Sequence, residues 1–221
     1  MTFQRARSEE QREIRRRTIL DTALAMLDEM PVAELSLNEL SRRVGLAKSN
    51  VLRYFETREA VLIELLEQAM ARWQERLSEA LAAAVDPRLP AKERGNQLAA
   101  VVSRSLADDT VLCELISAQA GVLERNVSVD VVVSHKRFTT AYLGSMVELV
   151  QRHVPELGDG ARSVCLMAFI LAGALSTYCR PSASVLAAYA TDPALAELRM
   201  DLPRELENAV ATLVAGTLAR G

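Results

Sequence analysis

The chain has 221 residues with a formal net charge of −3 at pH 7, and half of its residues are hydrophobic. This length suits one or two domains. The acidic balance excludes a polycation that coats nucleic acid, so any DNA binding must come from a local patch. The three cysteines lack C-x-x-C spacing, and the first 20 residues lack an apolar core. We therefore expect a cytoplasmic protein without a secretory signal or disulfide framework.

Helical periodicity runs along the chain, and the prolines fall between the apolar-periodic segments, because proline breaks a helix interior. The first predicted helix opens at a capping box, Ser8 with Gln11, and ends before Pro31. No segment has the convincing alternation of a strand, so the expected fold class is all-α.

Two short helices follow in the region of residues 36–55. Ser36 with Glu39 forms a second capping box and starts a helix that ends near Arg43. Gly45 supplies a turn, and the next helix is expected over residues 48–55. Two short helices joined by a glycine-containing turn, the second polar on one side, are typical of a helix-turn-helix.

A long helix is predicted from its N-cap at Thr57, with an apolar stripe that reaches Ala84. It joins a small N-terminal unit, residues 1–56, to a helical body, residues 57–221. Further helices of the body are expected near residues 91–107, 109–124, 128–153, 161–179, 183–190 and 202–219. Residues 163–179 carry no charge. They are slightly short for a membrane span, so we interpret them as a helix buried on all sides.

The second short helix carries side chains suited to DNA. Arg and Lys neutralise phosphates, while Ser and Asn donate to phosphates or read base edges. Residues 36–58 hold five Lys or Arg and two acids, a local charge of +3 in an acidic chain. Val51, Leu52 and Phe55 are expected to hold the helix against its neighbours. The alternative is an ordinary solvated face on a helical hairpin.

Residues 14–66 closely resemble the DNA-binding domain of the tetracycline-repressor (TetR) family of transcriptional regulators. The resemblance lies in "ILDTALAMLDE" and "LSLNELSRRVGLAKSNVLRYFETREAVLIELL". Its marks are Gly45 in the turn, Tyr54-Phe55 at the end of the recognition helix and the basic Arg58 opening the fourth helix. Two residues depart from the family pattern: Ala47 stands where Ser or Thr often caps the helix, and Leu52 stands where many members have Tyr.

The resemblance implies an N-terminal three-helix helix-turn-helix DNA-binding domain, joined by the long helix to a C-terminal ligand-binding and dimerisation domain. By position, the DNA contacts are expected from Ser36, Arg43, Lys48, Ser49, Asn50, Arg53, Tyr54 and Arg58. The DNA partner would be a double-stranded palindromic operator, because such readers usually pair two half-sites.

A ligand pocket and a dimer seam are expected in the body. Amphipathic or aromatic residues on apolar stripes are the candidates for the pocket: Trp73, Gln119, His135, Phe138, Tyr142 and Tyr178. Each has the alternative reading of a satisfied core side chain. Small residues and the apolar stripe of the last helix are the candidates for a homodimer seam: Ala168, Ala172, Gly173, Leu206 and Leu213. Both helices could instead belong to the core of a monomer.

The predicted function is a DNA-binding transcriptional regulator, a repressor released from its operator by a small apolar or amphipathic ligand. One alternative is a helical ligand-binding or protein-adaptor module that does not recognise an operator. A second is an enzyme, which the sequence disfavours. His135 and His153 lack zinc-ligand spacing, and no catalytic triad order is recognisable. No metal, cofactor or membrane partner is expected.

Overall fold

The computed structural model describes the backbone of residues 2–220 and the side chains of residues 9–220. Within this range every regular element is a helix, which confirms the all-α prediction. In chain order the elements are α1 (Thr2–Glu29), the 3₁₀ turn η1 (Val32–Glu34), α2 (Leu37–Val44), α3 (Lys48–Val51), α4 (Arg58–Ala84), α5 (Ala91–Asp108), α6 (Thr110–Ala118), the π-helical turn η2 (Gln119–Leu123), α7 (Val129–His153), the 3₁₀ turn η3 (Pro155–Gly160), α8 (Ala161–Tyr178), α9 (Ala183–Thr191), the 3₁₀ turn η4 (Pro193–Leu198) and α10 (Leu202–Leu218).

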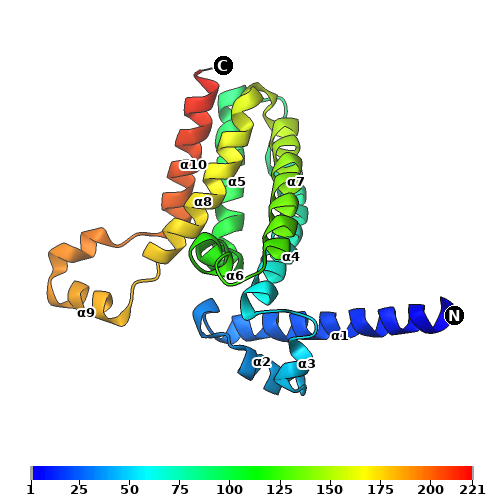
Figure 1. Cartoon of the computed structure of the whole chain (residues 1–221). Helices are drawn as coiled ribbons and strands as arrows, with labels where there is room; N and C mark the ends of the chain where they lie inside the picture. The colour runs from blue at the N-terminus through cyan, green and yellow to red at the C-terminus, as the bar shows by residue number, and fades with distance from the viewer. Residues whose placement is uncertain (1, 221) are drawn as a thin grey trace.

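The helices form two units that share α4 (Figure 1). The lower unit, which we call the head, contains α1, α2 and α3. The upper unit, the body, contains α5 to α10, and α4 runs from one unit into the other. Along α4, Leu62 and Leu66 are fully buried near the head, and Trp73 and Leu81 are buried further along in the body. One continuous helix therefore contributes buried side chains to both units.

Local sequence signals place most helix ends. The Ser36 side chain accepts a hydrogen bond from the Glu39 amide at 3.2 Å, and Thr57 accepts one from the Ala60 amide at 3.1 Å. Gly45 ends α2 with φ of 73°, a left-handed conformation that glycine adopts without steric cost. Both predicted caps and the predicted turn are confirmed.

The first helix begins earlier than predicted. It starts at Thr2 and runs through the expected capping box, because neither glycine nor proline interrupts the residues before Ser8. The backbone of Ser8 is helical, while its side chain lies outside the described residues. The C-terminal half of α1 packs into the head through buried Ile19, Ala23 and Met26, and the N-terminal half extends away from it (Figure 1).

Helix α8 is buried on one face only, which corrects the expectation of burial on all sides. Val164, Ala168 and Ala172 are buried, whereas Leu166 is 40% and Ile170 51% exposed. By length and composition alone, Pro155–Tyr178 could cross a bilayer, yet its buried face packs on α6, α10, α7 and α5. The exposed apolar face therefore remains available for a ligand or a partner.

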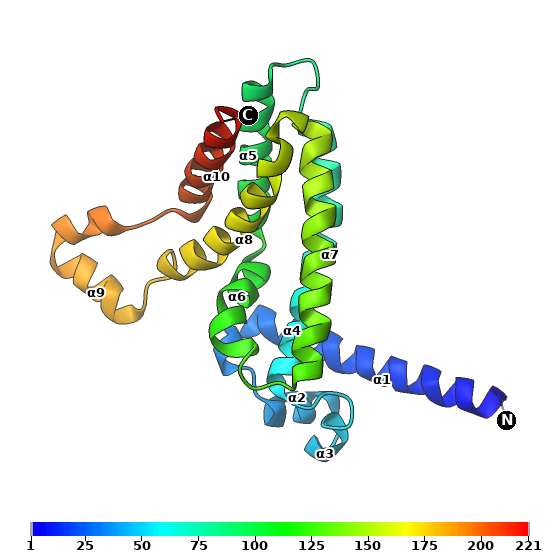
Figure 2. The same ribbon diagram turned by 45° about the horizontal axis from the view of Figure 1, so that its top comes forward.

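The segment between α8 and α10 projects from the body as an arm (Figure 2). It holds α9 and η4, and neither element contains a buried residue. Apolar side chains on this arm are exposed, among them Leu186 at 42% and Leu198 at 66%. Sequence reasoning predicted the helix near residues 183–190 but not its detachment from the body.

Candidate DNA interface and ligand cavity

The recognition helix is shorter than predicted. Its α-helical part covers Lys48–Val51, and the expected continuation to Phe55 is a tight turn in which the Tyr54 amide donates to the Val51 carbonyl at 2.9 Å. Ala47 stands at the N-cap without a side-chain hydrogen bond, as its departure from the family pattern predicted. Backbone hydrogen bonds to the residue three positions earlier tighten the last turn of short helices. Here they bring Arg53 to the same surface as the polar side chains of Lys48–Val51.

The polar side of this helix is free to meet DNA. Lys48, Ser49, Asn50 and Arg53 are all exposed, while Val51 is fully buried and anchors the helix. Phe55, at 3% exposure, is the second anchor. Leu52 was expected to be a third, but it is 41% exposed. It lies on the surface among the polar groups, where an apolar side chain can contact a thymine methyl.

Two predicted DNA contacts, Arg43 and Arg58, have partners inside the chain. Arg43 binds Glu29 at 2.7 Å and Glu39 at 3.0 Å. Hydrogen bonds from Arg42 and then Arg43 lower the pKa of the Glu39 carboxyl to about 2. Arg58 donates to the Ala33 carbonyl at 3.2 Å. These intramolecular bonds fix the geometry of the head and leave less of either charge for a phosphate.

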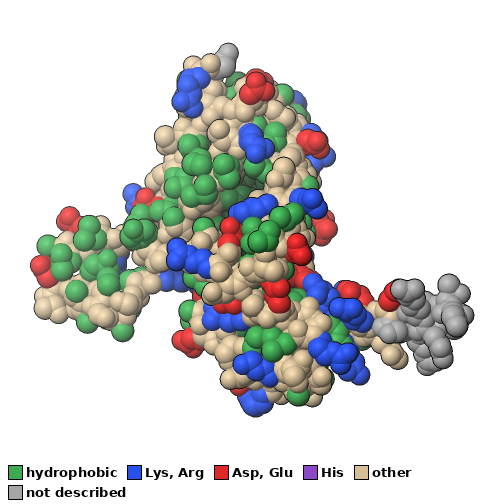
Figure 3. All heavy atoms as spheres, viewed as in Figure 1, with side chains coloured by type: hydrophobic (Ala, Val, Ile, Leu, Met, Phe, Trp, Pro, Cys, Tyr) green, Lys and Arg blue, Asp and Glu red, His purple; other side chains and the backbone are tan. Residues whose placement is uncertain are grey.

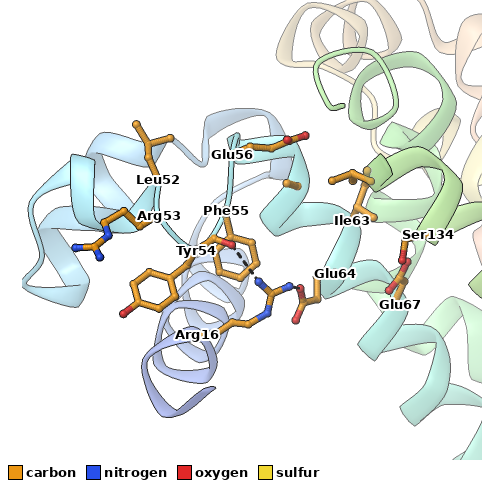
Figure 4. Close-up of a pocket in the computed structure, with 12 residues that line it drawn as sticks. Arg16, Leu52, Arg53, Tyr54, Phe55, Glu56, Ile63, Glu64, Glu67 and Ser134 are labelled. Carbon is orange, nitrogen blue, oxygen red and sulfur yellow. Dashed lines mark hydrogen bonds and ion pairs between the residues drawn. The ribbon is translucent and has the colours of Figure 1, made fainter. Parts of the chain in front are cut away.

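Arg16 is a head residue that sequence reasoning missed. Its guanidinium donates to the Tyr54 carbonyl at 3.0 Å, lies 4.4 Å from the centre of the Phe55 ring and pairs with Glu64 of α4. Figure 4 shows these groups converging beside the turn that ends the recognition segment. The only available sequence signal was a run of arginines, residues 15–17, on the first helix.

Lys and Arg side chains gather over the head and the adjoining part of α1 in the space-filling view (Figure 3). Arg12, Arg15 and Arg17 of α1 are exposed, in addition to the cations of the recognition helix. Clustered cations of this kind supply the sequence-independent part of DNA affinity. The local basic patch predicted for this acidic chain is therefore present on its head.

The body contains a cavity of about 460 Å³ between α4, α6, η2, α7 and α8. This volume lies in the range of small-molecule sites. Most of its wall is apolar, formed chiefly by Met70, Ile116, Leu143, Leu166, Phe169 and Ile170. One part of the wall is polar, with Gln119, Glu124 and Lys136. An apolar chamber with a small polar region suits an amphipathic molecule.

A second hollow of about 380 Å³ is a cleft between head and body. It is lined by Arg16, Tyr54, Glu64, Glu67 and Ser134, among others, and Figure 4 shows α4 crossing it. Its wall is mainly polar, and it lies where α4 leaves the head. We interpret it as space into which the head can tilt rather than as a ligand site.

Comparison with known proteins decides the family. Residues 67–221, more than half of the chain, match the family described as tetracyclin repressor-like, C-terminal domain. Residues 19–65 match the bacterial regulatory proteins of the tetR family. The chain belongs to the TetR family of transcriptional regulators.

Solved structures of TetR-family regulators share the fold of this one. A TetR transcriptional regulator from Rhodococcus sp. RHA1 is 13% identical, with a TM-score of 0.61 over 95% of this chain and 97% of that one. FadR from Bacillus subtilis, solved with stearoyl-CoA, is 19% identical, with a TM-score of 0.52 over 90% and 97%. The fatty acid degradation regulator FadR from Bacillus halodurans is 18% identical, with a TM-score of 0.51 over 90% and 97%. No curated protein sequence matches the chain.

Of the six predicted ligand residues of this TetR-family protein, Gln119 and Tyr142 line the cavity. Phe138 stacks on Tyr142 with ring centres 5.9 Å apart. His135 is fully buried beside Gln119. Burial raises the pKa of Tyr142, and its hydroxyl is buried without a hydrogen-bond partner.

Four of the six ligand candidates, His135, Phe138, Trp73 and Tyr178, do not line the cavity. Trp73 is buried behind Phe169, with the two rings edge to face and their centres 5.2 Å apart. Tyr178 is 73% exposed at the end of α8. Phe169, which sequence reasoning did not select, is thus the aromatic residue that separates the cavity from the tryptophan.

The predicted small-residue seam faces the core of its own chain. Ala168, Ala172, Gly173 and Leu206 are buried in the single chain, and Leu213 is half-buried against the core. A Cβ at Gly173 would lie 2.8 Å from Ile116 Cγ2 of α6. The small residues therefore allow α8 to approach α6, and in this chain they are not surface available to a second copy.

Proposed function

We propose that this TetR-family regulator is a homodimeric repressor that reads a palindromic operator and releases it when an apolar or amphipathic ligand occupies the body. The observation that carries the proposal is that one helix serves both sites. Helix α4 lines the cavity through Met70 and begins at Arg58, directly after the recognition segment. A ligand that prefers one tilt of α4 shifts the population of head positions by its difference in affinity for the two tilts.

Side-chain chemistry indicates which residues would contact base edges and which would contact phosphates. Asn50 and Arg53 suit base edges, since Asn holds adenine and Arg holds guanine with two hydrogen bonds each. Lys48 and Ser49 suit phosphates, with Ser36 and Tyr54 at the margins of the surface. Ser36 is exposed and Tyr54 half-buried.

The ligand class follows from the cavity wall, which is apolar with one polar region. The solved FadR of Bacillus subtilis, which shares the fold, holds stearoyl-CoA. This supports a ligand with a long apolar part and a polar head for the present chain. TetR-family regulators are generally non-enzymatic. We therefore rank the enzyme alternative below the DNA-binding regulator and below the ligand-binding or adaptor module.

A homodimer would form through the exposed apolar surface rather than through the buried small residues. Leu166 and Ile170 of α8, which also line the cavity, and Leu186 and Leu198 of the arm are exposed. Contiguous exposed apolar surface marks an interface, and a symmetric pair matches a palindromic operator. The occupant we propose is therefore a second copy of the chain.

The deciding experiment selects bound fragments from random double-stranded DNA with the full-length protein. Enrichment of a palindrome supports operator recognition by a dimer. Sedimentation of the same preparation at micromolar concentration should give twice the mass of the chain. Recovery of unrelated sequences, with an affinity that depends only on salt, would instead favour the adaptor alternative.

A further inference from the structure

We propose that His135 is a positioning residue that couples the cavity to α4, and that the effective ligand carries a hydrogen-bond acceptor which competes for the Gln119 side chain. The inference rests on the proposed function and names the contact by which occupancy would reach the head.

His135 is fully buried on α7 and has a partner at each ring nitrogen. Its Nδ1 lies 2.9 Å from Glu67 Oε1 on α4, and its Nε2 lies 3.0 Å from Gln119 Nε2 on η2. A carboxylate only accepts, so the Nδ1 proton is donated to Glu67. The Nε2 atom then accepts from the Gln119 amide. The His135 ring in this arrangement connects η2 to α4 directly.

Of Glu67, His135 and Gln119, Gln119 is the one that lines the cavity. Its Nε2 also donates to Glu124 Oε1 at 2.9 Å, so both of its amide protons are engaged. Glu124 receives a further bond from Lys136 at 2.6 Å. A ligand acceptor can bond to Gln119 only by displacing Glu124 or His135.

The backbone at Gln119 is suited to rearrangement. Residues Gln119–Leu123 form a π-helical turn rather than a continuation of α6, and such turns are rare and frequently lie at functional sites. When a ligand acceptor takes the Gln119 amide proton that His135 accepts, rather than the one that Glu124 accepts, His135 Nε2 loses its donor inside the protein. A buried acceptor without a hydrogen-bond partner lowers the stability of the fold. The His135 ring therefore moves, and its hydrogen bond to Glu67 weakens.

Glu67 lies one turn from Glu64 on α4, and Glu64 holds Arg16. Arg16 in turn donates to the Tyr54 carbonyl at the end of the recognition segment. Figure 4 shows Glu64 and Arg16 beside the cleft, with Glu67 further along the same helix. A change in how Glu67 is held therefore acts on the same stretch of α4 that positions the head.

The first test needs no ligand and uses the full-length protein with its selected operator. Gln119→Leu and Glu67→Leu should each weaken operator binding about tenfold, within the usual range of allosteric coupling. The double variant should also lose only about tenfold, because either change alone breaks the chain through His135. In a His135→Leu background, neither change should have a further effect.

Gln74→Leu is the matched control. It removes another hydrogen bond between α4 and α7, from Gln74 to Ser145 at 2.8 Å, and neither residue lines the cavity. It should leave operator affinity within twofold. Thermal unfolding of every variant checks that the chain folds. Effects of Gln119→Leu and Glu67→Leu that multiply, or an equal loss in Gln74→Leu, would overturn the inference.

The second test uses decanoate and decylamine, which share a chain length and differ in whether the head group accepts or donates. Decanoate should weaken operator binding more than decylamine in the wild type, and Gln119→Leu should remove that difference. Equal responses in the wild type, including no response to either, would overturn the acceptor requirement. Failure of the wild type to select any palindrome would instead reject the proposed function itself.

Discussion

Arg58 donates from Nη1 to the carbonyl oxygen of Ala33 at 3.2 Å, joining the start of α4 to η1. The Nε atom of the same side chain is buried without a hydrogen-bond partner. A residue expected to hold phosphate is thus also a structural tie between two elements of the head. Removing it would alter the position of α4 as well as the charge, so it is a poor probe of phosphate contact alone.

Lys48 and Arg43 form a cleaner pair for measuring phosphate contacts. Lys48→Ala should weaken binding to all sequences and lower the salt slope of log K by about one. Arg43→Ala should lower it less, because Glu29 and Glu39 already pair with that charge. Fluorescence anisotropy over a series of salt concentrations measures both. An unchanged slope in Lys48→Ala would remove Lys48 from the interface.

Gly173→Glu and Leu198→Glu should distinguish an effect on the stability of the fold from an effect on dimerisation. At Gly173 a side chain meets Ile116 at short range, so the variant should lose at least about 1–3 kcal/mol of stability through overpacking. Leu198 is 66% exposed on the arm, so Leu198→Glu should keep the melting temperature of the folded chain and weaken the dimer. Thermal unfolding and sedimentation measure these outcomes. A full-strength dimer in Leu198→Glu would exclude that part of the arm from the seam.

The emission of Trp73, the only tryptophan in the sequence, should report on the cavity indirectly. Phe169 lines the cavity and packs edge to face on Trp73. A compound that releases operator DNA should therefore shift Trp73 emission by moving Phe169, and Phe169→Leu should reduce that shift. Compounds that release DNA from both proteins with identical emission changes would show that the signal does not pass through Phe169.

Acid should loosen α2 through Glu39. Hydrogen bonds from Arg42 and Arg43 depress the pKa of this carboxyl from 4.5 to about 2. The stabilisation is therefore complete above about pH 4.5 and is lost as the pH falls toward 2. Glu39→Gln should flatten this part of the stability profile in low salt, with a small effect because the group is exposed. Circular dichroism melts from pH 6 to pH 2 test it, and identical profiles for both proteins would reject the contribution.

The helical layout and the reading head were predictable because they depend on local signals. Ser36 and Thr57 cap helices through bonds to amides three residues away, and Gly45 turns the chain through its own φ. The body helices end near prolines or caps and follow the predicted segments closely. The family resemblance was likewise carried by a short contiguous stretch, which both family matches bear out.

The faces of the helices and the partners of the charges were decided only by the tertiary structure. Composition gave no means to tell which side of α8 meets α6, so Gly173 was assigned to a partner subunit rather than to its own core. Arg43 pairs with Glu29 fourteen positions away, and His135 with Glu67 sixty-eight positions away. Such contacts depend on how helices cross in space, whereas caps, turns and periodicity depend on residues a few positions apart.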